Sequence, residues 1–440
     1  MNRILEVNIE KIVTGGKGMG RVDGKVVFAE RCAVGDTVSI QVITEKKSYV
    51  NGEVIGIVKE SPDRVTPECK YFDQCGGCDF WHVGYETELK YKKLLFLETL
   101  KKIGRIELND VKIHASPSYK HYRNRVQFKV RNVNGDVLLG FYKKGSRHVI
   151  DIDKCLITNE KINEQILSAK SLLKELPFSE NIPQVDFTID DADKKIFMII
   201  HVISDDFGSV RASIAEKFKD FFTEDVIPFI QMGRKSTTKP VFPESADETV
   251  SYRITSATRD FDYRLSLSPG SFLQVNYPQN LRLIETVLNY LDLTKDDSVL
   301  DLFSGAGNFS FAASHFCKDV IGIESYEPAV RDAKRNLAQL KIGNVKFICS
   351  DVDAELEKMM GSRLAFDNMI IDPPRTGAIS ALKKISKLIK KKIAYVSCDM
   401  ATFSRDIAFL QSAGFTLNEI CLVDMFPRTH HVEISAGFKI

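Results

Sequence analysis

Cys398 is the residue whose type and place best suit covalent chemistry. It stands in Val-Ser-Cys-Asp at 396–399, after an apolar run that predicts a buried strand and before a helical pattern. A buried cysteine is more often an inert small hydrophobe. At the carboxyl end of a strand, facing a ligand crevice and a helix start, it can instead act as a thiolate nucleophile. The position therefore favours a catalytic cysteine.

A thiol nucleophile of this kind needs a base to complete a reaction cycle. The segment 426–433 reads Phe-Pro-Arg-Thr-His-His-Val-Glu and supplies candidates. Glu433 is the predicted base, with a surface strand residue as the alternative. His430 and His431 fit the sequence as structural histidines too, and for His430 that interpretation is preferred.

A Gly-rich loop and three carboxylates follow successive predicted strands. The loop is Asp-Leu-Phe-Ser-Gly-Ala-Gly-Asn-Phe at 301–309, and Glu324, Asp351 and Asp372 follow the next strands. Glycines let a backbone approach a ligand closely, and a helix start offers free N–H groups. Gly-x-Gly alone also fits a dehydrogenase, and Asp351 alone fits a helix N-cap. Taken together, the four features match the layout of S-adenosylmethionine-dependent methyltransferases.

The residues after Asp372 narrow the type of methyltransferase. Enzymes that methylate exocyclic amino groups usually place an aromatic residue after Pro-Pro, and here Arg375 stands there. RNA cytosine carbon-5 enzymes carry a second cysteine directly after their Asp-x-Pro, which this chain lacks. Both of these classes are disfavoured.

A cysteine cluster predicts a metal centre. Cys69, Cys75 and Cys78 are spaced x5 and x2 in a Gly-containing loop, and Cys155 is a possible fourth ligand. Four thiolates suit either zinc or an iron–sulfur cluster. The spacing favours iron–sulfur, because a zinc ribbon would show a second Cys-x-x-Cys. The remaining cysteines outside the catalytic position are interpreted as core.

The elements that must position these residues divide the chain into three parts. Residues 1–60 show short strand patterns (4–12, 25–28, 37–44, 51–58) typical of a small β-barrel. Residues 61–275 are mixed, with helices predicted at 85–103 and 159–175 and strands at 124–131, 137–143, 147–152, 184–190 and 196–203. Residues 276–440 alternate strands (298–303, 319–324, 345–349, 368–372, 393–397) with helices such as 327–340 and 400–413, and end in strands at 416–425 and 431–440. This alternation indicates a mostly parallel α/β sheet.

Composition sets limits on location and partners. The chain has 440 residues, 44% of them hydrophobic, and a net charge of +2. It has no run of eighteen apolar residues and no apolar signal core at its start, which predicts a cytoplasmic protein without membrane contact. Global charge does not indicate nucleic-acid binding, so that prediction depends on local groups. They are the basic residues Lys17, Arg21, Lys25, Lys46, Lys47, Arg123, Arg125, Lys129 and Arg131, with the aromatic Tyr122 among them.

These motifs together resemble the RNA uridine-5-methyltransferase family, most closely its bacterial 23S ribosomal RNA members. Further segments carry the resemblance: Tyr-Arg-Asn-Arg-Val-Gln-Phe at 122–128 and Phe-Leu-Gln-Val-Asn at 272–276. The resemblance implies a Rossmann-like class I methyltransferase domain, a TRAM/OB-like barrel and a central α+β domain carrying an iron–sulfur loop. It implies a [4Fe-4S] cluster on the four cysteines, Cys398 as nucleophile and Glu433 as base. It also implies S-adenosylmethionine contacts from Gln274, Phe303, Asn308, Glu324, Asp351 and Asp372.

The expected activity is methylation of carbon 5 of a uridine in 23S ribosomal RNA by a monomeric enzyme. Carbon 5 of uracil is a poor nucleophile until a thiolate adds to carbon 6, which explains the need for a cysteine and a base. A transfer RNA T-loop uridine is the alternative substrate, because archaeal-type tRNA members can carry both barrel and cluster. A second alternative is a non-catalytic factor that binds ribosomal RNA.

Overall fold

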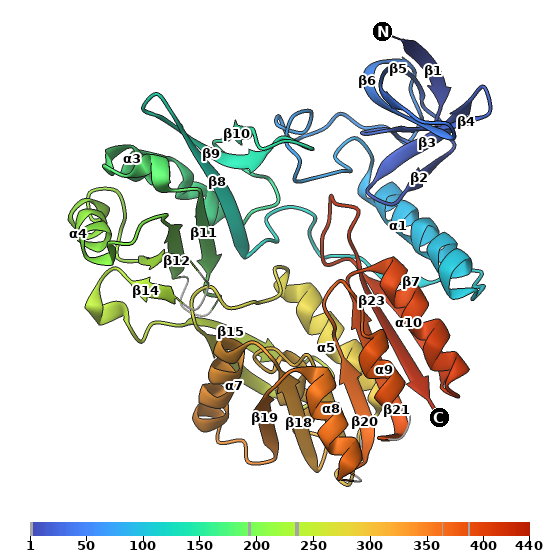
Figure 1. The fold of residues 1–440 in the computed structure, drawn as a ribbon, viewed down its shortest axis with the longest axis vertical. Helices are drawn as coiled ribbons and strands as arrows, with labels where there is room; N and C mark the ends of the chain where they lie inside the picture. The colour runs from blue at the N-terminus through green and yellow to red at the C-terminus, as the bar shows by residue number, and fades with distance from the viewer. Residues whose placement is uncertain (1–2, 192–194, 234–236, 363, 386–387) are drawn as a thin grey trace.

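The computed structural model describes residues 3–191, 195–233, 237–362, 364–385 and 388–440. Figure 1 shows three parts: N-terminal strands in blue, a central segment in cyan and green, and a C-terminal sheet flanked by helices in yellow to red. In the described ranges, no helix is both long and apolar enough to cross a lipid bilayer.

The N-terminal part is a six-stranded, strongly curved sheet. Its strands are β1(Ile4–Asn8), β2(Lys11–Val13), β3(Lys17–Val22), β4(Lys25–Ala29), β5(Thr37–Glu45) and β6(Tyr49–Lys59), in the order β1-β5-β6-β4-β3-β2. The sheet curves until β3 lies against β1, since a Cβ on Gly20 would lie 2.1 Å from the carbonyl oxygen of Asn8. The sequence-based prediction joined β1 and β2 into one strand at 4–12 and contained no strand at the position of β3.

The central part is built on a seven-stranded sheet. Its order is β10(Val149–Asp151), β9(Asp136–Tyr142), β8(Arg125–Val133), β11(Gln184–Ile189), β12(Ile196–His201), β13(Val226–Gln231) and β14(Thr238–Pro240). The helix predicted at 159–175 is two helices, α2(Glu160–Glu164) and α3(Ile166–Glu175), and α4(Phe207–Phe218) lies in a region with no prediction. An irregular cysteine-bearing loop and α1(Tyr85–Thr99), extended by a π-helical turn at Leu100–Gly104, connect this part to the barrel.

The C-terminal sheet has eight strands. They are ordered β19(Val345–Cys349), β18(Asp319–Glu324), β17(Ser298–Leu302), β20(Phe366–Ile371), β21(Ile389–Ser397), β23(Glu433–Lys439), β22(Thr416–Val423) and β7(Lys112–His114). The first five are parallel, and β23 runs antiparallel to β21 and β22. The helices are α5(Tyr277–Leu291), α6(Asn308–Ser314), α7(Glu327–Leu340), α8(Val352–Gly361), α9(Ile379–Ile385) and α10(Met400–Ser412), with a hairpin of β15(Val250–Thr255) and β16(Asp262–Leu267) beside them.

The central segment contributes directly to this sheet. β7 pairs parallel to β22, and Phe96 and Leu100 are fully buried in the core that β17, β20 and β21 share. The predicted boundary at residue 276 therefore does not coincide with a boundary in packing, because α1 and β7 precede it in sequence and pack with the C-terminal sheet. The division into three domains stays a prediction.

Candidate active site

Three of the predicted cofactor-binding features lie where the order of the parallel strands reverses. β17 lies between β18 and β20, so the loops that leave these strands diverge at their carboxyl ends. Open α/β sheets bind ligands at such a switch point. The Gly-rich loop follows β17, Glu324 ends β18 and Asp372 follows β20.

The Gly-rich loop has a constrained backbone. Phe303 has φ 61° although it has a bulky side chain, and Gly307 has φ 94°. A Cβ on Gly307 would lie 2.5 Å from the ring of Phe311, so only glycine fits. Glu324 ties this loop to β18, because its carboxylate accepts hydrogen bonds from the N–H groups of Gly305 (3.1 Å) and Tyr326 (2.7 Å).

The other predicted cofactor residues have structural partners of their own. Asp351 is exposed and caps α8, where its carboxylate accepts a hydrogen bond from the N–H of Ala354 at 3.0 Å. Asn308 begins α6, and its amide exchanges two 2.9 Å hydrogen bonds with that of Asn280 on α5. Gln274 is half-buried between β16 and α5. Each side chain keeps further lone pairs or protons for a ligand.

Two carboxyl groups lie at the base of the loop: Asp301, which is buried, and Asp372, which is half-buried. Burial, with Asp372 and Glu324 nearby, raises the pKa of Asp301 to about 7 even though Ser310 hydrogen-bonds it. Burial also raises the pKa of Asp372 to about 7. Within the described part of the chain, Asp301 Oδ1 and Ser304 Oγ are buried without a hydrogen-bond partner. Unpartnered acceptors beside these carboxyl groups fit a ligand that brings positive charge and donor groups.

Cys398 and Glu433 meet across two strands. Ser397 pairs with Ile434 in the antiparallel register of β21 and β23, which places the next residue, Cys398, opposite Glu433. Burial and the charges of Glu433 and Asp372 raise the pKa of Cys398 to about 11, while the Arg375 guanidinium opposes the shift by charge and hydrogen bond. Burial and Asp372 raise the pKa of Glu433 to about 8, again opposed by Arg375. The predicted nucleophile and base are therefore neighbours.

Arg375 lies close enough to both Cys398 and Glu433 to act on each, a role that the sequence-based prediction did not assign to it. It was noted only because it replaces an aromatic residue, yet its charge acts on both Cys398 and Glu433. A fixed cation at this point favours the thiolate over the thiol. The Asp-Pro-Pro-Arg motif could have indicated this role, because it follows a strand adjacent to that of Cys398.

The first part of the segment that leads to Glu433, residues 424–428, is held by hydrogen bonds to its main chain. The carbonyl groups of residues 424–428 accept hydrogen bonds, in order, from Gln279, Asn276, Lys92, Tyr122 and the N–H of Asp79. Arg428 has φ 69°, donates from its N–H to Glu88 at 2.7 Å and from Nη1 to the carbonyl of Val83 at 3.0 Å. Its guanidinium also lies 4.1 Å from the ring centroid of Tyr119. The cysteine-bearing loop and α1 thus fix the approach to the base.

Replacement of Arg428 with methionine is expected to lower the free energy of unfolding by about 3 kcal/mol, because buried Glu88 loses a charged partner. Chemical denaturation measures the loss. Arg331→Met removes an exposed pair with Glu327 and is the matched control, expected to leave the unfolding midpoint nearly unchanged. Equal, small effects of the two replacements would contradict the role of Arg428.

The two histidines differ in their surroundings. His430 Nδ1 lies 2.7 Å from the carboxylate of Asp79, which also accepts from its main-chain N–H at 3.0 Å. This contact agrees with the structural interpretation of His430. His431 stacks near it with ring centroids 4.0 Å apart, and burial, His430 and Arg375 lower its pKa to about 4. His431 is therefore a neutral ring beside the reactive pair.

The four predicted metal ligands line one cavity of about 110 Å³, together with Trp81 and Arg123: Cys69, Cys75, Cys78 and Cys155. All four are free thiols. In the same loop, the backbone of Gly76 packs tightly against that of Tyr142, since a Cβ on Gly76 would lie 2.9 Å from the carbonyl oxygen of Tyr142. Among the residues that the structure describes, no three His, Cys, Asp or Glu side chains converge on a single metal-ion position.

Two predicted RNA contacts serve the fold instead. Arg125 donates to the carbonyl oxygen of Ser271 at 2.6 Å and lies 3.7 Å from Asp186. Tyr122 is buried and donates its hydroxyl to Pro427. The prediction that these two side chains face RNA was wrong, because the period-two strand pattern does not reveal segments that cover the strand. Arg131 remains exposed on β8.

The comparisons with known proteins agree with this architecture. Residues 84–438 match the tRNA (Uracil-5-)-methyltransferase family and residues 2–55 match the TRAM domain. An uncharacterized RNA methyltransferase of Clostridium acetobutylicum is 32% identical over 98% of this chain and 96% of its own length. The 23S rRNA (uracil(1939)-C(5))-methyltransferase RlmD of Shewanella denitrificans is 30% identical over 99% and 96%.

A solved structure extends the likeness to the whole fold. The tRNA (uracil-54, C5)-methyltransferase of Pyrococcus abyssi, in complex with S-adenosyl-L-homocysteine, has a TM-score of 0.74 at 22% identity over 99% of this chain and 100% of that one. The predicted resemblance is confirmed by the family match, which spans α1, Cys155 and every predicted catalytic and cofactor-binding residue. This chain belongs to the tRNA (uracil-5-)-methyltransferase family and carries an N-terminal TRAM domain.

Proposed function

We propose that this protein transfers a methyl group from S-adenosylmethionine to carbon 5 of a uridine in 23S ribosomal RNA. The observation that carries the proposal is the placement of Cys398 opposite Glu433, with Arg375 acting on both. Ribosomal RNA is preferred over transfer RNA because the relatives named for it are about 30% identical over nearly the full chain. The solved tRNA enzyme is 22% identical.

The reaction divides between the two residues. Cys398 Sγ forms a bond to carbon 6 of uracil, and the electron pair of the 5,6 double bond then makes carbon 5 nucleophilic. S-adenosylmethionine, when bound, supplies the methyl group that carbon 5 accepts. Glu433 removes the remaining proton from carbon 5, and the returning electron pair breaks the bond from carbon 6 to sulfur. A carboxylate whose pKa is raised to about 8 is a stronger base than an ordinary glutamate.

Six residues would hold the methyl donor: Gln274, Phe303, Asn308, Glu324, Asp351 and Asp372. Glu324 suits ribose hydroxyl groups, since it ends β18 beside the Gly-rich loop. Asp351 suits an adenine amino group, in competition with its capping bond. The unpartnered oxygens of Asp301 and Ser304 support a ligand at this loop.

Incubation with labelled S-adenosylmethionine and separate ribosomal and transfer RNA tests the proposed function. Mass-spectrometric mapping is expected to find 5-methyluridine in 23S ribosomal RNA. Methylation confined to transfer RNA would contradict the assignment of ribosomal RNA as the substrate and would leave the proposed mechanism unchanged. Binding of ribosomal RNA without any transfer would favour the non-catalytic alternative.

We further propose that the four cysteines hold a [4Fe-4S] cluster. A cluster occupies a volume between its ligands, and the four thiols surround one cavity. A structural role for the cluster fits this position. The same loop contributes the Asp79 N–H and the Val83 carbonyl, which hydrogen-bond Arg428 in the segment before Glu433. A monomeric, cytoplasmic enzyme remains a prediction from the sequence.

Anaerobic purification tests the cluster. The unmodified protein is expected to contain about four iron atoms and matching acid-labile sulfide per chain. Cys75→Ser is expected to lose most of this iron. Cys349 lies away from the loop and is exposed, so its interpretation as a core cysteine was wrong, and Cys349→Ser is expected to keep the iron. Zinc in place of iron, or equal iron in both variants, would contradict the assignment.

A further inference from the structure

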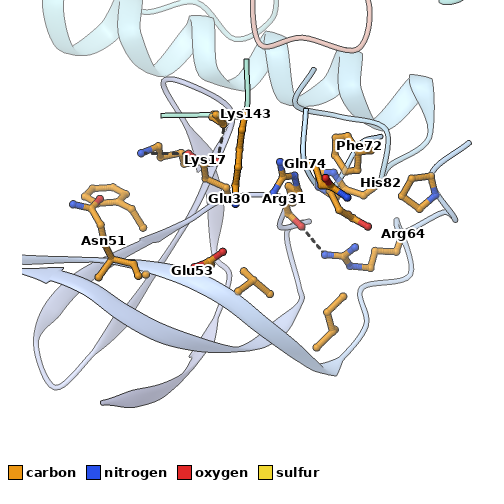
Figure 2. Close-up of a pocket in the computed structure, with 18 residues that line it drawn as sticks. Lys17, Glu30, Arg31, Asn51, Glu53, Arg64, Phe72, Gln74, His82 and Lys143 are labelled. Atoms are coloured by element: carbon orange, nitrogen blue, oxygen red, sulfur yellow. Dashed lines mark hydrogen bonds and ion pairs between the residues drawn. The ribbon is translucent and has the colours of Figure 1, made fainter. Parts of the chain in front are cut away.

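A cavity of about 630 Å³ lies between the barrel and the cysteine-bearing loop, and the active-site proposal makes no use of it. Figure 2 shows side chains from three regions turned toward it: Asn51 and Glu53 from the barrel, Phe72 and Gln74 from the loop, and Lys143 from the turn after β9. Its volume falls within the range of small-molecule and nucleotide sites.

The cations around this cavity are only partly neutralised. Lys17 and Lys144 both approach Glu30, at 3.8 and 3.5 Å, and Lys144 also reaches Asp79 at 2.9 Å. For Arg31 and Lys143, no described carboxylate lies within ion-pair distance. The rim therefore offers two cations to an anionic ligand.

One wall of the cavity is a stack that ends in an unsatisfied histidine. The Arg31 guanidinium lies 5.5 Å from the ring centroid of Phe72, and that ring stacks on His82 at 5.5 Å with a 22° tilt. His82 is 1% exposed, and in the described chain neither ring nitrogen has a hydrogen-bond partner within 3.5 Å. Burial lowers the pKa of His82 to about 4, opposed by the nearby Cys32 main chain, which forms no such hydrogen bond. Buried polar groups are rarely left unpaired, so the ring marks a place for a ligand's polar group.

The cavity is connected to the catalytic segment. Asp79 accepts from Lys144 on the cavity side and from His430 on the other. A Cβ on Gly16 of the barrel would lie 2.9 Å from Asp79 Cβ and 3.4 Å from His430 Cβ, so the three regions meet there. Asp79 therefore links the wall of the cavity to the segment that leads to Glu433.

We propose that this cavity binds a second nucleotide of the RNA substrate, away from the target uridine. Arg31 and Lys143 hold its phosphate, and its base enters the cavity, where His82 pairs with a polar edge. Single-stranded RNA is recognised by this combination of cations, aromatic rings and hydrogen bonds to base edges. The inference rests on the proposed function for the identity of the polymer.

His82→Phe separates the ligand role from a role in folding. It keeps an aromatic ring in the stack and removes both nitrogens, so thermal stability is expected to be unchanged or higher. Affinity for a fragment of 23S ribosomal RNA, measured by fluorescence anisotropy without cofactor, is expected to fall about tenfold. Unchanged affinity in a variant of unchanged stability would overturn the proposal.

The double variant Arg31→Ala, Lys143→Ala tests the phosphate contacts. Its affinity should fall, and the slope of log affinity against log salt concentration should flatten by about 1.4, as expected for two lost contacts to a single strand. Lys334→Ala, Lys383→Ala removes two exposed charges from the C-terminal part and is the matched control. Equal salt slopes in the two double variants would also overturn the proposal. Because RNA binding is measured in the absence of methyl transfer, a failure of this proposal can be distinguished from a failure of the proposed enzymatic activity.

Discussion

Cys398→Ala is expected to lower methyl transfer to RNA by about four orders of magnitude or more, while affinity for S-adenosylmethionine stays within about twofold. The reason is that carbon 5 of uracil becomes nucleophilic only after sulfur adds to carbon 6. None of the residues proposed to hold the methyl donor depends on the thiol. Burial and two carboxyl neighbours raise the pKa of Cys398 to about 11, so Arg375 is its source of positive charge.

Single-turnover methylation and calorimetric titration of the cofactor measure these two effects. Cys421→Ala is the matched control, because Cys421 is a buried cysteine on β22 that does not belong to the proposed active site. It is expected to retain activity. Substantial methylation by Cys398→Ala would exclude the mechanism in which sulfur adds covalently to carbon 6.

The α/β part of the fold was predictable because local patterns determine it. Strands 319–324 and 345–349 and helix 327–340 begin and end where predicted, since apolar runs and a 3.6-residue period mark them clearly. The region 205–250 was not predictable. Its strand β13 is buried at every position, so it shows no alternation that separates a strand from other apolar segments.

The reactive pair was predictable from residue type and place, whereas its support was not. Arg428 meets Glu88 across 340 positions of sequence and Tyr122 meets Pro427 across 305, and no local pattern reports such contacts. Asp351 illustrates the opposite case, because a strand-end carboxylate and a helix cap look the same in sequence. In the structure this residue caps α8 and stays exposed, so both roles are compatible.

Glu433→Gln is expected to stop the reaction after methyl transfer and accumulate a covalent complex of protein and RNA. Glutamine has nearly the size of glutamate and cannot take the proton from carbon 5, so the bond between Cys398 and carbon 6 persists. The variant should fold normally. A buried carboxyl whose pKa is raised to about 8 destabilises the fold as pH rises above its unfolded pKa, and a neutral amide removes that cost.

Denaturing electrophoresis with labelled RNA should reveal a slowly migrating band for Glu433→Gln that disappears when Cys398→Ala is added. Glu419→Gln, at an exposed position of β22, should turn over like the unmodified protein. RNA with 5-fluorouridine offers a second trap, because fluorine replaces the proton that Glu433 removes. Full turnover by Glu433→Gln would assign the base to another group near carbon 5. The half-buried Asp372 would then be the first to replace, since after burial its charge contributes to the raised pKa of both Glu433 and Cys398.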